Sequence, residues 1–169
     1  MQVVNPDKPF VLRVDASGRA VGASLEQLPE DAGRPTPENV KRGQTIPVAF
    51  MSRKLAPSQL RTWDTRDKEA YAIVSALEKW AGWIGLQPVL VLTDHKNLQS
   101  WARETLSPPG GIPGRRARWH QKLSRFDITV AYVPGKDNVV ADALSRWEYP
   151  ASQSFTTCPG MVRRRMTLK

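Results

Sequence analysis

The chain has 169 residues, of which 40% are hydrophobic and six are tryptophan, a size and composition that exclude a disordered chain and fit one domain with a sizeable core. Its single cysteine excludes an internal disulfide and a cysteine-based zinc site, and favours an intracellular, reducing compartment. The formal net charge of +9 favours a polyanionic partner, with nucleic acid ahead of an anionic membrane.

Residues 1–8 are interpreted as a lead-in to the first strand. They contain neither a basic n-region nor a long apolar h-region, so we expect no secretory signal there. No apolar run in the chain approaches the length of about 18 residues that a membrane span needs, so we expect no membrane span.

The first two strands are predicted to form an antiparallel hairpin. Residues 10–15 alternate between two faces, which is typical of a strand, and Asp15 stands at the end of this strand. Residues 16–19 predict a turn. Residues 20–27 predict the second strand, in which Gly22 allows a close backbone approach.

A long connection is predicted before the third strand. Residues 28–44 contain three prolines and two glycines among several charges, which indicates an exposed hairpin connection. Residues 46–52 resume the strand pattern and predict the third strand. Residues 55–58 predict a turn.

A long helix follows. Apolar residues recur at helical spacing from Ala70 to Ile84, and Asp64 or Thr65 is placed to cap the N-terminus of this helix. At about 100° per residue, Glu69 lies near the edge of the apolar stripe. An acid at the edge of a buried face needs a partner, a water-filled cleft or a metal.

The fourth strand is predicted at residues 89–92, an apolar run without alternation that is typical of a strand buried on both faces. Asp94 follows it, at the edge where open α/β sheets carry their sites. On this stretch alone, the alternative that Asp94 only caps the next helix stays open. That helix is predicted to run through Glu104 and to be followed by a loop at residues 106–114.

The remaining elements are a basic helix, a fifth strand and a last helix. Residues 115–125 predict the basic helix, and residues 127–133 alternate and predict the strand. Asn138 is placed to cap the last helix, on which Val140 and Leu144 would face the core. This last helix is predicted over residues 139–147.

Three parts of the chain are therefore expected. Residues 1–8 are the lead-in, residues 9–148 are the folded domain, and residues 149–169 are a basic tail that is flexible or docks to a partner. The tail carries three consecutive arginines and no acid.

Four acids stand out along this order of elements, namely Asp15, Glu69, Asp94 and Asp142. A right-handed crossover sets the fourth strand parallel to the first and beside it, so Asp15 and Asp94 come from adjacent strands. A helix packed over that sheet can bring Glu69 to them. Clustered carboxylates repel one another and favour divalent cations such as Mg²⁺ or Mn²⁺. Two such ions can activate water and stabilise the leaving oxygen in phosphodiester cleavage.

Six long segments of the chain resemble, in the same order, the ribonuclease H domain of Ty3/gypsy-type LTR retrotransposon reverse transcriptases. They are P-F-V-L-R-V-D-A-S (9–17), V-G-A-S-L-E-Q (21–27), P-V-A-F-M-S-R-K-L (47–55), D-K-E-A-Y-A-I-V (67–74), L-T-D-H-K-N-L (92–98) and Y-V-P-G-K-D-N-V-V-A-D-A-L-S-R (132–146). The resemblance implies an α/β, ribonuclease H-like fold. This fold has a mixed five-stranded sheet, with strands 1, 2 and 3 in an antiparallel meander and strands 4 and 5 parallel, flanked by helices.

The resemblance also implies an activity. Asp15, Glu69, Asp94 and Asp142 match the family's D-E-D-D metal-binding set, which implies two Mg²⁺ ions with Mn²⁺ as a substitute. The implied reaction is endonucleolytic hydrolysis of the RNA strand of an RNA–DNA hybrid, leaving 3′-hydroxyl and 5′-phosphate ends. The loop at residues 134–137 lacks the histidine that many cellular ribonucleases H carry there, a departure that gypsy-type enzymes share.

Such a hybrid has to be held by its phosphate backbone. The candidates are the cations of the basic helix, and the alternative is a solvated helix face with no such role. These candidate residues are Arg115, Arg116, Arg118 and Lys122.

Two other functions are compatible with parts of this sequence. In one, the chain is a retroelement-derived module recruited as a non-catalytic structural subunit of a larger ribonucleoprotein assembly, with the basic tail as its docking arm. In the other, it is a transposase or integrase of the same superfamily. The second fits worse, because those enzymes place their acids in a D-D-E order.

Overall fold

The computed structural model describes residues 4–29, 34–40, 44–100 and 114–147. Its centre is a five-stranded sheet of order β3-β2-β1-β4-β5. β1 and β2 pair antiparallel, as do β2 and β3, whereas β4 lies parallel to both β1 and β5, so the predicted mixed sheet is confirmed. The strands are β1 (Phe10–Ala16), β2 (Ala20–Gln27), β3 (Ile46–Lys54), β4 (Val89–Thr93) and β5 (Ile128–Tyr132).

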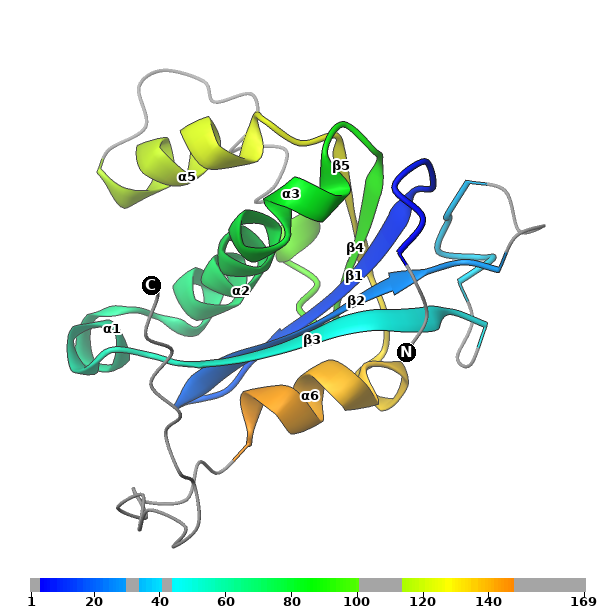
Figure 1. The fold of residues 1–169 in the computed structure, drawn as a ribbon. Coiled ribbons are helices and arrows are strands. Elements are labelled where there is room, and N and C mark those ends of the chain that lie inside the picture. Colours follow the sequence, from blue (N-terminus) through cyan, green and yellow to red (C-terminus); the bar gives the residue numbers. More distant parts are fainter. Residues whose placement is uncertain (1–3, 30–33, 41–43, 101–113, 148–169) are drawn as a thin grey trace, which may run out of the picture.

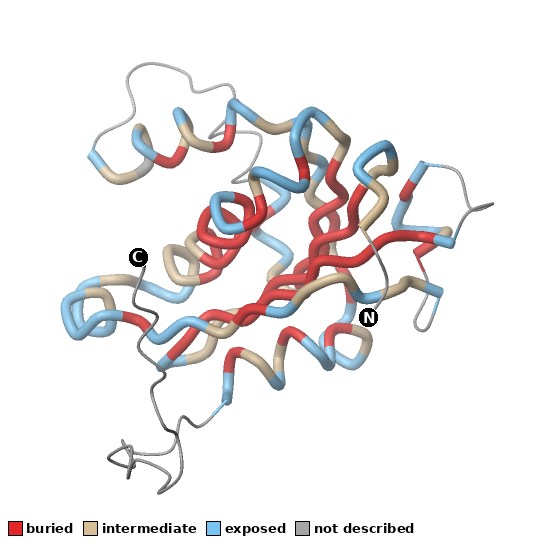
Figure 2. The backbone as a smooth tube through the Cα atoms, viewed as in Figure 1, coloured by how far each residue is buried: buried red, intermediate tan, exposed pale blue. Residues whose placement is uncertain are grey.

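Helices cover the two faces of this sheet (Figure 1). On one face lie α2, α3 and α5, and on the other lies α6. All five residues of β4 are buried, as a strand covered on both faces should be. Figure 2 shows the buried backbone concentrated in the central strands and in α2. The helices are α1 (Pro57–Thr62), α2 (Thr65–Lys79), α3 (Ala81–Ile84), α5 (Arg115–Leu123) and α6 (Val139–Ser145), with a short 3₁₀ helix, η1 (Gly135–Asp137), before α6.

The predicted long helix is confirmed in part. Asp64 caps α2, because its carboxylate accepts a hydrogen bond of 2.7 Å from the Asp67 backbone nitrogen. The helical run is interrupted at Trp80, and α3 continues the apolar spacing to Ile84. The structure also contains α1 where the sequence predicted only a turn. This helix begins at a proline, which is tolerated in the first turn.

The predicted core face of α6 is wrong. Val140 is 43% exposed and Leu144 is only half-buried, whereas the buried residues of the helix are Ala141 and Ser145. The reason is the close backbone approach at Gly22: a Cβ there would clash with the Ala141 carbonyl oxygen and the Ser145 nitrogen. Small side chains therefore occupy this contact, and Val139 and Val140 are exposed.

The cap predicted for α6 also differs from the structure. Asn138 stands at the N-cap position, yet its side chain makes no capping hydrogen bond among the described residues. Its Nδ2 instead donates to the Val14 carbonyl oxygen of β1 over 2.8 Å. The amide therefore fastens the start of α6 to the central strand.

The connection over residues 28–44 is less exposed than predicted. Leu28 and Val40 are buried in a second apolar cluster on the face of the sheet that carries Val11. Arg34 of this connection forms a 3.6 Å ion pair with Asp127, next to β5. Leu28 and Val40 therefore cover part of the sheet.

Some predictions fall outside the described residues. The helix predicted after Asp94 is seen only at residues 98–100, and its continuation and most of the following loop lie outside. The basic tail lies outside as well. None of the helices among the described residues combines the length and the apolar composition that a membrane crossing requires.

Candidate active site

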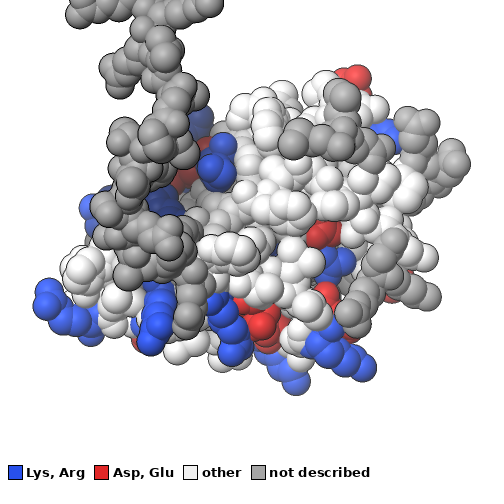
Figure 3. All heavy atoms as spheres, turned by 60° about the horizontal axis from the view of Figure 1, so that its bottom comes forward, with Lys and Arg blue, Asp and Glu red and all other residues white. Residues whose placement is uncertain are grey.

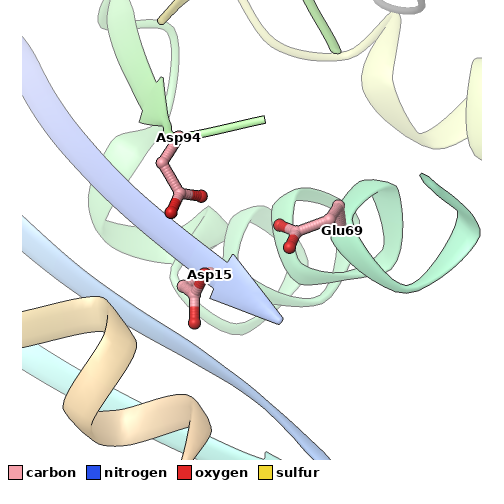
Figure 4. Close-up of side chains that lie close together, drawn as sticks. All are labelled: Asp15, Glu69 and Asp94. Carbon is pink, nitrogen blue, oxygen red and sulfur yellow. The ribbon is translucent and has the colours of Figure 1, made fainter. Parts of the chain in front are cut away.

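Three of the four predicted acids meet at one edge of the sheet. Asp15 lies near the end of β1, Asp94 directly follows β4, and Glu69 projects from α2. β1 and β4 are parallel neighbours, so their carboxyl ends lie side by side. Figure 4 shows the three side chains around one space, and one carboxylate oxygen of each lies within 4.8 Å of those of the other two. We call these three residues the carboxylate trio.

The trio is poorly solvated. Asp15 and Glu69 are buried, and Asp94 is half-buried. Burial raises the pKa of Glu69 to about 8, with further contributions from the charges of Asp15 and Asp94. Glu69 Oε2 is buried without a hydrogen-bond partner among the described residues. Burial likewise raises the pKa of Asp15, against a lowering by the Ser145 hydroxyl.

These features fit a cation site. Oxygen ligands at this spacing suit a hard divalent cation, and a positive charge would relieve the repulsion and the desolvation that raise both pKa values. An unpartnered buried carboxylate oxygen is a free ligand position. All three donors are carboxylates, so this cluster lacks the soft sulfur ligands of many zinc and copper sites.

Asp142 stands beside the trio rather than within it. It lies in α6, on the opposite face of the sheet from α2, and its charge contributes to the raised pKa of Asp15. Its carboxylate forms a 2.7 Å ion pair with Arg146 one turn later. The structure therefore places all four acids at one edge but joins only three of them in a single cluster.

Ser145 and Gly135 also contact the trio, and neither was predicted as a site residue. The Ser145 hydroxyl of α6 donates a hydrogen bond to the Asp15 carboxylate. Gly135 in η1 lies against Asp94, since a Cβ at that position would be 3.2 Å from Asp94 Oδ2. A sequence signal for Ser145 existed: it follows Asp142 by three residues, which is one helical turn.

Of the predicted phosphate-binding cations of α5, Arg115 and Lys122 form ion pairs with α2, whereas Arg118 is exposed. Arg115 forms an ion pair with Asp67 and lies 4.7 Å from the centroid of the Trp63 ring, so it fastens α5 to α2. Lys122 forms a 2.6 Å ion pair with Glu78 of α2. Arg118 is exposed, and the Arg116 side chain lies outside the description.

Comparison with known proteins identifies the family of this architecture. Residues 5–126 match the sequence model described as "RNase H-like domain found in reverse transcriptase", a match that ends before β5 and α6. The transposon Tf2-3 polyprotein of Schizosaccharomyces pombe is 35% identical over 141 residues, or 82% of this chain. The chain spans about a tenth of the length of that polyprotein and of its similar relatives.

Solved structures share the fold. The native protease–reverse transcriptase of prototype foamy virus has a TM-score of 0.55 and 17% identity, and covers 79% of this chain and 16% of its own. LC11-RNase H1 in complex with an RNA/DNA hybrid has a TM-score of 0.50 and 14% identity, and covers 80% of this chain and 91% of its own. At these identities the likeness shows the fold alone.

Proposed function

The chain belongs to the family of RNase H-like domains found in reverse transcriptases, and we propose that it hydrolyses the RNA strand of RNA–DNA hybrids with two divalent metal ions. The observation that carries this proposal is the carboxylate trio at the edge formed by β1 and β4. The implied ions are Mg²⁺, with Mn²⁺ as a substitute.

The residues of the chain have separate tasks in this proposal. Asp15, Glu69 and Asp94 would hold the cations, and Asp142 would join them from α6. When bound, such cations supply an activated water and stabilise charge on the leaving oxygen. The protein keeps the carboxylates in place: two stand at the ends of buried strands, and the Ser145 hydroxyl holds the carboxylate of Asp15.

Lys and Arg side chains on the surface support a nucleic-acid substrate. Arg118 on α5 is exposed, and beside Ser145 an open cleft is lined by Arg19, Lys54 and Arg146. Figure 3 shows Lys and Arg side chains along the border of the face that it displays, with acids between them. The related fold of LC11-RNase H1 is described in complex with an RNA/DNA hybrid, which supports a hybrid as the partner.

The organisation around this domain is part of the proposal. We infer that residues 9–148 form the nuclease domain, and that the basic tail of residues 149–169 contacts nucleic acid or a larger ribonucleoprotein assembly. An intracellular, reducing setting is supported by the single cysteine.

The test is cleavage of a hybrid with labelled RNA in Mg²⁺ and in Mn²⁺. Asp94→Asn keeps the side-chain shape and removes one ligand charge, so we expect a loss of at least about a hundredfold in rate. Asp127→Asn is the matched control, because Asp127 is an exposed acid that pairs with Arg34 and should leave the rate unchanged. A folded parent that does not cut at high concentration would contradict the proposal and favour the non-catalytic subunit.

A further inference from the structure

The segment between β5 and α6 sets the position of two parts of the site. We call residues 134–138, which include η1, the corner. Its Gly135 lies against the Asp94 carboxylate, where no Cβ would fit without displacement. The corner also leads directly into α6, which carries Asp142 and Ser145. A shift of the corner would therefore move α6, with Asp142 and Ser145, and change the contact with Asp94.

A buried ion pair holds the corner. Arg13 lies on β1, two residues before Asp15, and is only 6% exposed. Its Nε donates to Glu26 Oε2 over 3.1 Å, and its Nη1 donates to the Asp137 carbonyl oxygen of the corner over 3.2 Å. The other oxygen of Glu26 accepts a 2.6 Å hydrogen bond from the Ser24 hydroxyl. The guanidinium thus joins β1, β2 and the corner.

The neighbouring residues repeat this attachment. Asn138, next to Asp137, donates its side-chain amide to the carbonyl oxygen of Val14, next to Arg13. Arg13 and Val14, which directly precede Asp15 in β1, therefore hold Asp137 and Asn138 of the corner. This arrangement fixes the distance between β1 and the start of α6.

The pair does not belong to the carboxylate trio. Arg13 and Glu26 bond to each other, to Ser24 and to the corner. The apolar cluster of Val11, Leu90 and Leu92 packs on the same face of the sheet, so apolar side chains could take the place of Arg13 and Glu26. A buried ion pair generally adds little stability compared with such side chains, and its best-attested use is to specify one geometry.

We propose that the Arg13–Glu26 pair positions the residues of the site. It holds the corner so that Asp94, Asp142 and Ser145 keep the geometry needed for cation binding. This inference rests on the proposed nuclease function. The guanidinium is suited to this task, because its planar fork can serve a carboxylate and a carbonyl at once.

The test replaces both partners in Arg13→Met/Glu26→Leu, which leaves no unpaired buried charge. We expect this variant to fold, with amide hydrogen exchange at Asn138 and Asp142 about tenfold faster and with Mn²⁺ affinity about tenfold weaker. In hybrid cleavage, kcat should fall by about ten- to a hundredfold. KM should stay unchanged, because the Lys and Arg side chains proposed to hold the substrate are not altered.

Two controls sharpen the result. Ile84→Ala removes a buried side chain in α3, on the opposite face of the sheet from α6. It should lower stability while leaving Mn²⁺ affinity, kcat and KM unchanged. Arg13→Lys keeps the positive charge but lacks the planar guanidinium, so its Mn²⁺ affinity should lie between those of the double variant and the parent. It also serves if the double variant does not fold.

A folded double variant with the exchange rates and Mn²⁺ affinity of the parent would overturn the proposal, as would full recovery of kcat by Arg13→Lys. If the parent neither binds Mn²⁺ nor cleaves, the nuclease function itself fails. The positioning of the corner is then decided by hydrogen exchange alone, where unchanged rates overturn it.

Discussion

Among single residues, Glu69 links burial to chemistry most directly. Its carboxyl has a reference pKa of 4.5 and a folded pKa of about 8, caused first by burial and then by Asp15 and Asp94. Between these two values the folded chain binds more protons than the unfolded chain. The contribution of protonated Glu69 to the stability of the fold is thus fully present below about pH 4.5 and is lost as pH rises through about 8. Without a cation, the folded protein should therefore lose stability across this window.

Replacing Glu69 tests this electrostatic description. Glu69→Gln cannot ionise, so we expect the cation-free variant to be more stable than the parent at pH 8, by the order of a few kcal/mol, and to show a smaller loss of stability between pH 5 and pH 8. Urea unfolding in the presence of a chelator at several pH values measures both effects. Glu78→Gln is a suitable control, because Glu78 is a half-exposed acid of the same helix. Equal pH dependence in parent and Glu69→Gln would contradict the assigned pKa.

Between elements, the contact of β2 with α6 depends on Gly22. Gly22→Ala would place a methyl group against the backbone of α6, so we expect a loss of at least about 1–3 kcal/mol of stability and weaker cleavage, because α6 carries Asp142 and Ser145. Gly18→Ala is the matched control, since Gly18 has open space and no positive φ. Urea unfolding of both variants measures the difference. A Gly22→Ala protein as stable as the parent would show that the helix can move outward freely.

The attachment of α5 to α2 predicts different roles for two of its arginines. Arg115→Ala removes the contacts with Asp67 and Trp63, so we expect mainly a stability loss of about 1–2 kcal/mol. Arg118→Ala should leave stability unchanged but weaken hybrid binding and reduce the slope of log affinity against log salt concentration by about one. Binding measured at several salt concentrations separates the two. A salt slope that Arg118→Ala leaves unchanged would remove α5 from the interface.

The positions of several elements follow from the sequence pattern alone. Strand periodicity located β1, β2 and β4, and parallel pairing of β1 with β4 brought Asp15 and Asp94 together as predicted. The orientation of α6 was missed, because a helical stripe reports which residues are apolar and not how closely the sheet approaches. The corner contacts of Arg13 were missed as well, since they join residues more than 120 positions apart.

For the whole molecule, the site depends on both sides of the sheet. Glu69 comes from α2 on one face, whereas Asp142 comes from α6 on the other, and the two strands between them supply the remaining acids. A cation that binds only the assembled site should stabilise the entire fold by mass action. We expect Mn²⁺ to raise the unfolding midpoint of the parent and to leave that of Asp94→Asn nearly unchanged, as measured by thermal unfolding. An equal rise in both proteins would place Mn²⁺ elsewhere.

We expect the carboxylate trio to be a cation site whose buried acid, Glu69, gives up its proton when the metal binds. The most direct measurement is calorimetric titration of the parent with Mn²⁺ at pH 7, in two buffers of different ionisation enthalpy. With the pKa of Glu69 at about 8, binding should release about one proton per chain, and Glu69→Gln should bind more weakly without this release. If the parent binds no Mn²⁺, or if Glu69→Gln binds it with the same affinity and proton release, the claim is contradicted.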